Sequence, residues 1–165
     1  YETEDQIAAA KYLANKPYID ENNIGIFGWS YGGYMSSLCI TKGADVFKSA
    51  IAVAPVTNWR YYDNIYTERF MQKPQDNGEN YDINSPINHV EKLKGNYLLI
   101  HGTADDNVHF QNATEMVSAL VNKNKQFEFF AYPDKNHGIY GGFTRLHLYT
   151  KMTNFLMETL MEENE

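Results

Sequence analysis

The chain has 165 residues and a formal net charge of −7 at pH 7, from 14 Lys and Arg against 21 Asp and Glu. Its length fits one domain with a core of its own, and its acidic balance argues against nucleic-acid binding and against polybasic attachment to a membrane surface. The apolar runs, such as 51–56, are short, far below the ~20 residues that a bilayer span needs.

Apolar spacing and turn residues predict alternating helices and strands along the chain. The first helix is expected to open at Thr3 and Gln6, which have capping-box spacing, and to end before Pro17. The later elements are, in order, a buried strand at 24–29, a helix at 32–42, a buried strand at 49–54, a short helix within 57–71, a loop at 72–84, a short helix at 85–93 that Ser85 and Pro86 open, a strand at 96–101, a helix at 111–122, a strand at 126–132 and a closing helix at 142–162. Four strands alternating with helices predict an α/β fold, a parallel sheet with helices on both faces.

Residues 28–32, GWSYG, form a G-x-S-x-G motif between a predicted strand and a predicted helix, which is the context of a nucleophile elbow. Such a turn holds Ser30 in a strained backbone conformation and exposes its hydroxyl at the end of the sheet. We expect side chains at Gly28 and Gly32 to collide across the turn, and Gly33 to relieve crowding further. The alternative is a glycine-rich turn without catalysis.

An elbow serine needs an acid and a base later in the chain, in the order Ser, Asp, His. Asp105 and His137 each follow a predicted strand. Both are therefore expected at the carboxyl ends of the strands, where the elbow also lies. The Tyr31 N–H, directly after the serine, is expected to face the oxyanion of a tetrahedral intermediate. Strand periodicity does not separate Asp105 from Asp106 as the acid.

Other histidines and motifs are weaker candidates. His109 lies in the same predicted loop as Asp105 (the acid loop) and stays an alternative base. We interpret the other three as packing, hydrogen-bonding or surface residues: His89, His101 and His147. No two histidines have H-E-x-x-H spacing and the single cysteine excludes thiolate sites, so we predict no metal and no cofactor. The sequon at 112–114 falls on a predicted helix, and we interpret it as chance.

Three segments carry a family resemblance: 28–34 (GWSYGGY), 101–109 (HGTADDNVH) and 137–138 (HG). They resemble the catalytic domain of the prolyl oligopeptidase family, and 59–69 (WRYYDNIYTER) is similar to its dipeptidyl-peptidase IV branch. The resemblance covers nearly the whole chain and implies the C-terminal portion of an α/β-hydrolase fold. It also implies a catalytic triad of Ser30, Asp105 and His137. The resemblance thereby favours Asp105 over Asp106 as the acid.

The resemblance further implies a substrate site beside the triad. It places an S1 pocket for proline at Val56, Trp59, Tyr62, Tyr66 and Val108, and a contact to the P2 carbonyl at Asn107. A shallow aromatic box suits the compact proline ring, and an exposed Tyr/Trp loop otherwise leaves apolar surface without a use. The alternative is that Tyr62 and Tyr66 are ordinary core residues.

The implied activity is that of a serine exopeptidase, which cleaves N-terminal Xaa-Pro or Xaa-Ala dipeptides from peptides through an acyl-enzyme. In this mechanism His137 takes the Ser30 proton, and Asp105 holds the imidazole in its tautomer. The alternatives are a broader serine esterase or oligopeptidase, and a non-catalytic association domain.

Parts of the family's enzyme are expected to lie outside this chain. The β-propeller, with the glutamates that grip the substrate's amino end, and a tyrosine of the oxyanion hole precede Tyr1 in the resemblance. We therefore expect 1–165 to be a single hydrolase domain truncated at its N-terminal side, with little activity alone and with the strand at 24–29 as a bare sheet edge. The whole enzyme is expected to be homodimeric, to act on peptides with a penultimate proline, and to be secreted, periplasmic or at the cell surface. We expect this chain to contact neither nucleic acid nor membrane.

Overall fold

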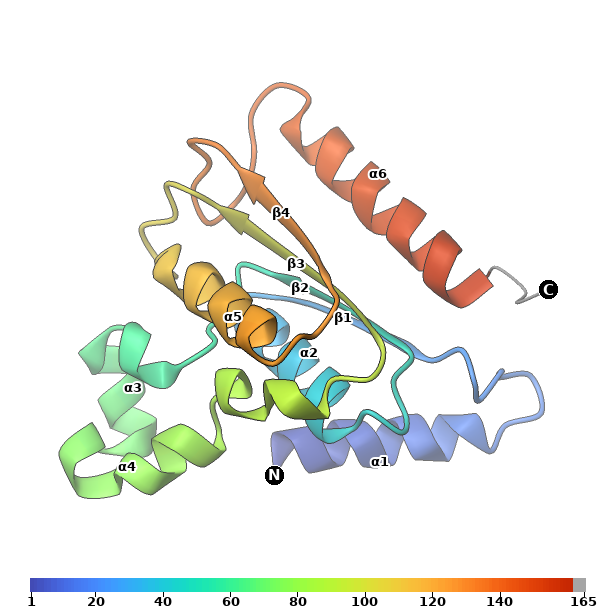
Figure 1. Cartoon of the computed structure of the whole chain (residues 1–165), viewed down its shortest axis with the longest axis horizontal. Helices are drawn as coiled ribbons and strands as arrows, with labels where there is room; N and C mark the ends of the chain where they lie inside the picture. Colours follow the sequence, from blue (N-terminus) through green and yellow to red (C-terminus); the bar gives the residue numbers. More distant parts are fainter. Residues whose placement is uncertain (162–165) are drawn as a thin grey trace.

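The computed structural model describes residues 1–161. At its centre lies a four-stranded sheet in the order β1-β2-β3-β4, and all three strand pairs are parallel (Figure 1). The strands are β1 (Gly25–Trp29), β2 (Ser49–Val53), β3 (Asn96–Gly102) and β4 (Glu128–Tyr132). The predicted parallel sheet is confirmed.

Helices cover both faces of this sheet, as predicted. The α-helices are α1 (Glu2–Ala14), α2 (Tyr31–Lys42), α3 (Asn64–Met71), α4 (Pro74–Ile83), α5 (Gln111–Asn122) and α6 (Thr144–Leu156). Two 3₁₀ segments, η1 (Trp59–Tyr61) and η2 (Pro86–Lys92), and a π-helical turn, η3 (Met157–Met161), complete the elements. In Figure 1, α2 and α5 lie on one face and α6 lies on the other.

Two cores follow from the alternation of side chains along the strands. In β2, Ala50 and Ala52 belong to the core under α2 and α5, whereas Ile51 and Val53 belong to the core under α6. Strand β3 alternates in the same way, and its buried segment separates the two cores. Both faces of these two strands are buried, which explains why apolar residues occupy successive positions along them.

The strand β1 is an edge strand of the described sheet, which confirms the expected bare edge. It is not the buried strand that the sequence predicts. Only Gly28 within it is buried, and Phe27 is 49% exposed. The reason is that, among the described residues, β1 pairs with β2 alone, so its other edge stays open although α2 packs against it.

The segment 72–84, predicted as a loop, forms the helix α4. Pro74 stands in the first turn, where a missing N–H costs no hydrogen bond. Tyr81 is buried, and its hydroxyl donates to the Gln72 carbonyl at 2.7 Å. This anchor is one of several contacts that hold a polar segment with no apolar periodicity of its own, among them the Arg60 guanidinium, which donates to the Gly78 carbonyl at 3.1 Å.

The predicted start of the first helix is also wrong. The helix begins at Glu2 with Tyr1 as N-cap, so Thr3 lies inside it. The Thr3 hydroxyl donates to the Met35 sulfur at 3.6 Å instead of capping the helix, because α1 packs against α2 there. The predicted end of the last helix, at 162, lies outside the described residues.

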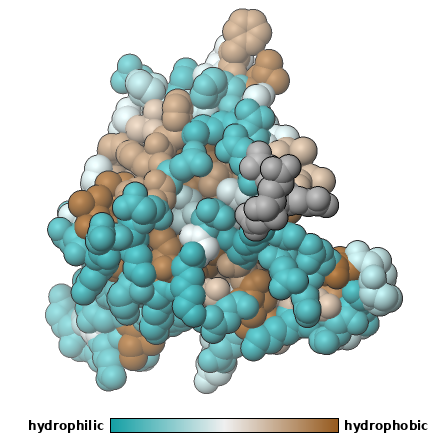
Figure 2. Space-filling view, turned by 45° about the vertical axis from the view of Figure 1, so that its right-hand side comes forward, coloured by the Kyte–Doolittle hydropathy of each residue, from teal (hydrophilic) through white to brown (hydrophobic). Residues whose placement is uncertain are grey.

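The surface carries separate apolar groups. In Figure 2, hydrophilic residues surround several hydrophobic groups on the face shown. On α6, Leu146 and Tyr149 are exposed. Within residues 1–161, no helix combines the length and the apolar content that crossing a bilayer demands.

Candidate active site

Ser30 occupies the sharp turn between β1 and α2. Its backbone has φ 59° and ψ −116°, a left-handed φ that costs energy for any residue with a Cβ atom. Two hydrogen bonds hold the turn: the Ser30 N–H donates to the Val53 carbonyl at 2.8 Å, and the Tyr34 N–H donates to the Ser30 carbonyl at 3.0 Å. The strained backbone predicted for this residue is confirmed.

The glycines around the turn differ in what they permit. A Cβ atom on Gly28 would stand 2.0 Å from the Gly32 carbonyl oxygen, and one on Gly33 would stand 2.9 Å from the Val53 carbonyl oxygen. Both would collide with backbone. A Cβ atom on Gly32 would meet nothing within 4 Å, so the collision predicted for Gly32 is wrong. Gly32 lies in the first turn of α2, where its missing side chain faces open space.

The Tyr31 N–H is the first backbone donor of α2. In the part of the chain that the structure describes, it donates to no backbone or side-chain acceptor. An N–H at this place, with the positive end of the helix behind it, is available to a developing negative charge.

Asp105 and His137 come from the loops after β3 and β4, and the structure brings them together. His137 Nδ1 lies 2.8 Å from Asp105 Oδ2, and the Asp105 side chain is fully buried. The other oxygen, Oδ1, accepts the N–H groups of Asn107 at 3.0 Å and of Val108 at 2.9 Å. A carboxylate with donors on both oxygens is fixed in place and supports an imidazolium at His137.

The ionisation of Asp105 reflects opposing influences. Burial disfavours the charged form, yet hydrogen bonds from the rings of His101 and His137 outweigh it and hold the pKa of Asp105 well below its ordinary value. Asp105 is therefore a carboxylate throughout the neutral pH range. Asp106 is exposed, and within residues 1–161 its side chain has no contact with His137.

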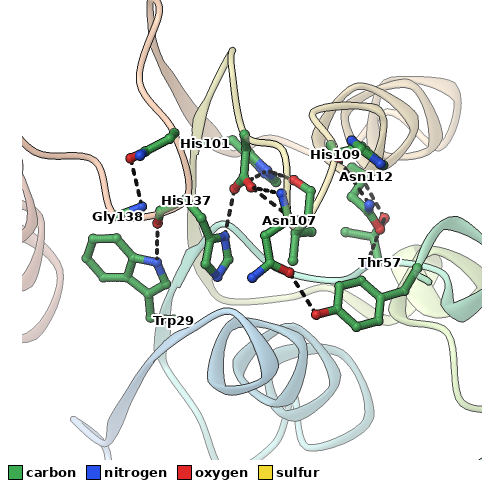
Figure 3. Close-up of polar contacts among 12 residues, drawn as sticks. Trp29, Thr57, His101, Asn107, His109, Asn112, His137 and Gly138 are labelled. Atoms are coloured by element: carbon green, nitrogen blue, oxygen red, sulfur yellow. Dashed lines mark hydrogen bonds and ion pairs between the residues drawn. The ribbon is translucent and has the colours of Figure 1, made fainter. Parts of the chain in front are cut away.

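Two backbones touch where the acid and base loops meet. A Cβ atom on Gly102 would stand 2.2 Å from the Lys135 carbonyl oxygen, which accepts the Ala104 N–H at 3.1 Å. The base loop is also tied to the elbow strand, because the Trp29 indole N–H donates to the His137 carbonyl at 3.0 Å (Figure 3). These contacts set the place of His137 relative to both Asp105 and the elbow.

The second pairing of the predicted triad, between Ser30 and His137, is not formed as a hydrogen bond. Within residues 1–161, the Ser30 hydroxyl makes no hydrogen bond, whether to His137 or elsewhere. The side chain of His137 is 23% exposed, so its ring is reachable from solvent. In unliganded sites a catalytic hydrogen bond is often long and tightens when substrate binds.

An aromatic cluster lies beside the elbow. We define it as five rings that are linked by ring-to-ring contacts: Tyr31, Tyr34, Trp59, Tyr62 and Tyr66. Trp59 is 6% exposed and Tyr66 is 41% exposed, so buried and open rings adjoin. The interpretation of Tyr62 and Tyr66 as ordinary core is wrong for Tyr66 and holds only in part for Tyr62, which is half-buried.

The other predicted pocket residues lie close to this cluster. Val56 and Val108 are buried in the same core as Trp59. The Tyr62 hydroxyl donates to Asn107 Oδ1 at 2.7 Å, which connects the aromatic cluster to the acid loop. Burial raises the pKa of Tyr62, so its hydroxyl keeps its proton.

A cavity of about 340 Å³ opens between β4 and α6, away from the elbow. A second cavity, of about 660 Å³, adjoins the aromatic cluster. Trp59 and Tyr66 line it together with Tyr31, Tyr34 and residues of α1, α3 and α4, but Ser30 and His137 do not. Of the six predicted pocket residues, the cavity thus includes two.

Sequence reasoning missed several residues of this region. Tyr34 is one, because a buried tyrosine on an apolar helix gives no signal of its own. Thr57 and Asn112 are others: Thr57 donates its N–H to Asn112 Oδ1 at 2.9 Å and its hydroxyl to the Asn112 carbonyl at 2.7 Å (Figure 3). Asn112 is fully buried, so the sequon at 112–114 is inaccessible, which agrees with its interpretation as chance.

The rival histidines are accounted for by other contacts. His89 approaches the Ile83 carbonyl at 2.7 Å, and His147 approaches the Tyr132 hydroxyl at 2.8 Å. His101 is buried near Asp105, as the packing or hydrogen-bonding interpretation predicts. Across residues 1–161, no three His, Cys, Asp or Glu side chains converge as metal ligands.

Comparison with known proteins gives consistent matches. The sequence matches the prolyl oligopeptidase family over residues 1–163. It is 51% identical to prolyl endopeptidase FAP of Homo sapiens and 46% identical to dipeptidyl peptidase 4 of Felis catus, each match covering 96% of this chain and 21% of the relative. The crystal structure of Porphyromonas gingivalis dipeptidyl peptidase 4 is similar with a TM-score of 0.95 and 49% identity, covering 97% of this chain and 23% of that chain.

The chain thus spans about a fifth of the length of the curated relatives that it matches, or 21%. Over that part, the sequence and the course of the backbone agree with those of the relatives. The chain belongs to the prolyl oligopeptidase family, in its dipeptidyl-peptidase IV branch, and has the α/β-hydrolase fold.

Proposed function

We propose that this chain is the catalytic part of a serine exopeptidase that removes N-terminal Xaa-Pro or Xaa-Ala dipeptides from peptides. The observation that carries the proposal is the buried Asp105 carboxylate 2.8 Å from His137 Nδ1, at the sheet edge where the elbow presents Ser30. Elbow, acid and base follow the chain order and the strand-end positions of an α/β-hydrolase triad.

The mechanism uses each member of the triad in turn. With its Nδ1–H donated to Asp105, His137 offers Nε2 as the base that takes the Ser30 Oγ proton. Ser30 Oγ then bonds to the substrate carbonyl carbon, and the Tyr31 N–H stabilises the oxyanion. As the C–N bond breaks, His137 returns the proton to the leaving amine, and a water molecule repeats the sequence to release the dipeptide from Ser30.

The aromatic cluster supplies specificity in this proposal. The stacked rings of Trp59 and Tyr66, 6.0 Å between centroids, with Tyr62 edge-on to both, offer a flat apolar wall to a proline ring. Because the Tyr62 hydroxyl occupies Asn107 Oδ1, the Asn107 amide N–H₂ is left to donate to the P2 carbonyl. Val56 and Val108 complete the pocket from the core side.

The length of the relatives bears on the whole enzyme. We propose that 1–165 works as one hydrolase domain within a longer, homodimeric protein, whose other segments hold the substrate's amino end and complete the oxyanion hole. On this proposal the chain alone has little activity. Loss of one oxyanion donor reduces rates by roughly 10²–10³. The family resemblance supports a secreted, periplasmic or cell-surface location.

The test compares a Gly-Pro chromogenic amide with a simple acetate ester, using the longer protein and the chain alone. We expect the longer protein to cleave the amide, the Ser30→Ala variant to cleave neither substrate, and the chain alone to be slow on the amide. Ester turnover without Gly-Pro cleavage in the longer protein would contradict the exopeptidase proposal. Efficient Gly-Pro cleavage by the chain alone would contradict the proposed dependence on further segments.

One comparison favours a second candidate. A relative at 51% identity is named a prolyl endopeptidase, so cleavage after internal proline residues is the alternative within the same chemistry. A Gly-Pro amide whose amino end is blocked by an acetyl group separates the two. An exopeptidase loses activity on the blocked substrate, whereas an endopeptidase retains it.

A further inference from the structure

His101 is a buried histidine beside the candidate triad that the proposed mechanism does not use. It lies near the end of β3 and is fully buried. Its Nε2 stands 2.8 Å from the Val108 carbonyl oxygen and 3.3 Å from Asp105 Oδ2 (Figure 3). The ring of Phe110 packs edge-on against it at 5.7 Å between centroids.

These contacts assign the ring proton. The Val108 carbonyl only accepts hydrogen bonds, so Nε2 must carry the hydrogen at this short distance. The other nitrogen, Nδ1, is buried and has no hydrogen-bond partner among the described residues. A proton there would leave a buried donor unsatisfied, which costs free energy. His101 is therefore the neutral Nε2–H tautomer, which donates its hydrogen to the Val108 carbonyl.

The same nitrogen also lies beside the carboxylate oxygen that His137 uses. Asp105 Oδ2 faces the His137 Nδ1–H at 2.8 Å and the His101 Nε2–H at 3.3 Å. Oδ1 is meanwhile held by two backbone N–H groups, those of Asn107 and Val108. Rotation of the carboxylate about its Cβ–Cγ bond would therefore break contacts on both oxygens at once.

Val108 takes part in the same arrangement twice. Its N–H donates to Asp105 Oδ1 at 2.9 Å, and its carbonyl accepts from His101 at 2.8 Å. His101, Asp105 and Val108 thus form a closed set of contacts between the end of β3 and the acid loop. Val108 also belongs to the proposed proline pocket, so the set connects the acid with the pocket.

We propose that His101 is a positioning residue: its Nε2–H holds the Val108 carbonyl at the edge of the pocket, and its ring keeps the Asp105 carboxylate in place for His137. The inference rests on the proposed function only in giving His137 the role of base. The hydrogen-bond geometry is a claim about the folded protein whether or not it cleaves Gly-Pro amides.

Two substitutions at His101 separate the hydrogen bond from the packing of the ring. His101→Gln keeps an N–H donor near the place of Nε2, and His101→Leu fills much of the volume without one. His109→Gln is the matched control, because His109 lies in the loop that holds Asp105 and its side chain is exposed. Circular dichroism shows whether each variant is folded.

The first measurement is nuclear magnetic resonance of the imidazole groups in the chain. We expect the His101 nitrogen shifts of the neutral Nε2–H tautomer, and a low-field proton resonance from the His137 Nδ1–H that is bound to Asp105. His101→Leu should broaden or abolish the low-field resonance, and His101→Gln and His109→Gln should keep it. A neutral Nδ1–H tautomer at His101 overturns the proposal even where the leucine variant does not fold.

The second measurement is the rate at which a fluorophosphonate probe labels Ser30, where the Ser30 Oγ–P bond forms as the P–F bond breaks. We expect His101→Leu to slow labelling by up to roughly 10²-fold, the effect of displacing a catalytic group by about 1 Å. His101→Gln should recover most of the rate. Equal impairment of folded Gln and Leu variants, or no effect of Leu, overturns the positioning role. Absence of labelling in the unaltered longer protein counts instead against the proposed function, and the resonance comparison still tests His101.

Discussion

At the carboxyl ends of β3 and β4, Asp105 and His137 are held by hydrogen bonds from buried groups, whereas the aromatic cluster beside them is held by ring contacts and is partly open to solvent. Hydrogen bonds fix both distance and direction, and ring packing fixes distance but tolerates rotation. The acid and base therefore keep their geometry in the absence of substrate, and the pocket wall adapts to what binds it.

The first prediction concerns the hydrogen bond between Asp105 and His137. Asp105→Asn keeps the volume but presents an amide to His137, which favours the wrong tautomer, so we expect kcat to fall by roughly 10⁴. Asp106→Asn is the matched control, because Asp106 is exposed, and it should leave kcat unchanged. Equal effects of the two variants on Gly-Pro amide hydrolysis would reject Asp105 as the acid.

The second prediction concerns the turn that carries the nucleophile. Gly28→Ala places a Cβ atom 2.0 Å from a backbone oxygen, and we expect it to lower the free energy of unfolding by about 1–3 kcal/mol, if the chain folds at all. Gly32→Ala has open space and should change it by less than about 0.5 kcal/mol. Urea denaturation compares the two. A Gly28→Ala variant as stable as Gly32→Ala would refute the predicted collision.

The third prediction follows from the lowered pKa of Asp105. A carboxyl whose pKa is lower in the folded state stabilises that state above its unfolded pKa, about 3.9, and this stabilisation is lost as the pH falls below that value. Each unit by which the pKa is lowered is worth about 1.4 kcal/mol. The difference in unfolding free energy between the unaltered chain and Asp105→Asn should therefore shrink from pH 5 downwards. A difference that does not vary with pH would contradict the lowered pKa.

The fourth prediction tests the hydrogen bond between the aromatic cluster and the loop that holds Asp105. Tyr62→Phe removes the hydroxyl that donates to Asn107, and we expect KM for a Gly-Pro amide to rise about 2- to 10-fold, the worth of one hydrogen bond, with kcat nearly unchanged. In an Asn107→Ala background the same substitution should have no further effect. Independent, additive effects would show that Tyr62 does not act through Asn107.

Much of the fold was predictable because strand and helix periodicities were strong. The helix α5 was predicted with its observed bounds, and the acid and base were found because each follows a strand of a parallel sheet. The segment of α4 was missed, since its helix depends on the tertiary anchor of Tyr81 and not on local spacing. The burial of β1 was wrong because its apolar run is typical of a buried strand, whereas the edge position that the resemblance implied leaves one side of it open.

Within the site, residue type and chain order identified candidates but not their contacts. Nothing in the local sequence separated Asp105 from Asp106, whereas burial and two backbone donors distinguish them in the structure. The contact of His101 with Asp105 was unforeseen because it requires the acid loop to fold back on the strand that precedes it. The open space at Gly32 likewise depends on the direction of a Cα–Cβ vector in three dimensions.

The close approach at Gly102 has a consequence for how such an enzyme varies. The chain at Gly102 and the loop that holds His137 are in contact through main-chain atoms. A Cβ atom on Gly102 would lie 2.2 Å from the Lys135 carbonyl oxygen. The contact atom is a main-chain oxygen, so replacing the Lys135 side chain without a change of backbone conformation leaves this contact in place. The spacing of acid and base therefore depends on main-chain atoms at this point, and residue 102 must stay the smallest of the amino acids.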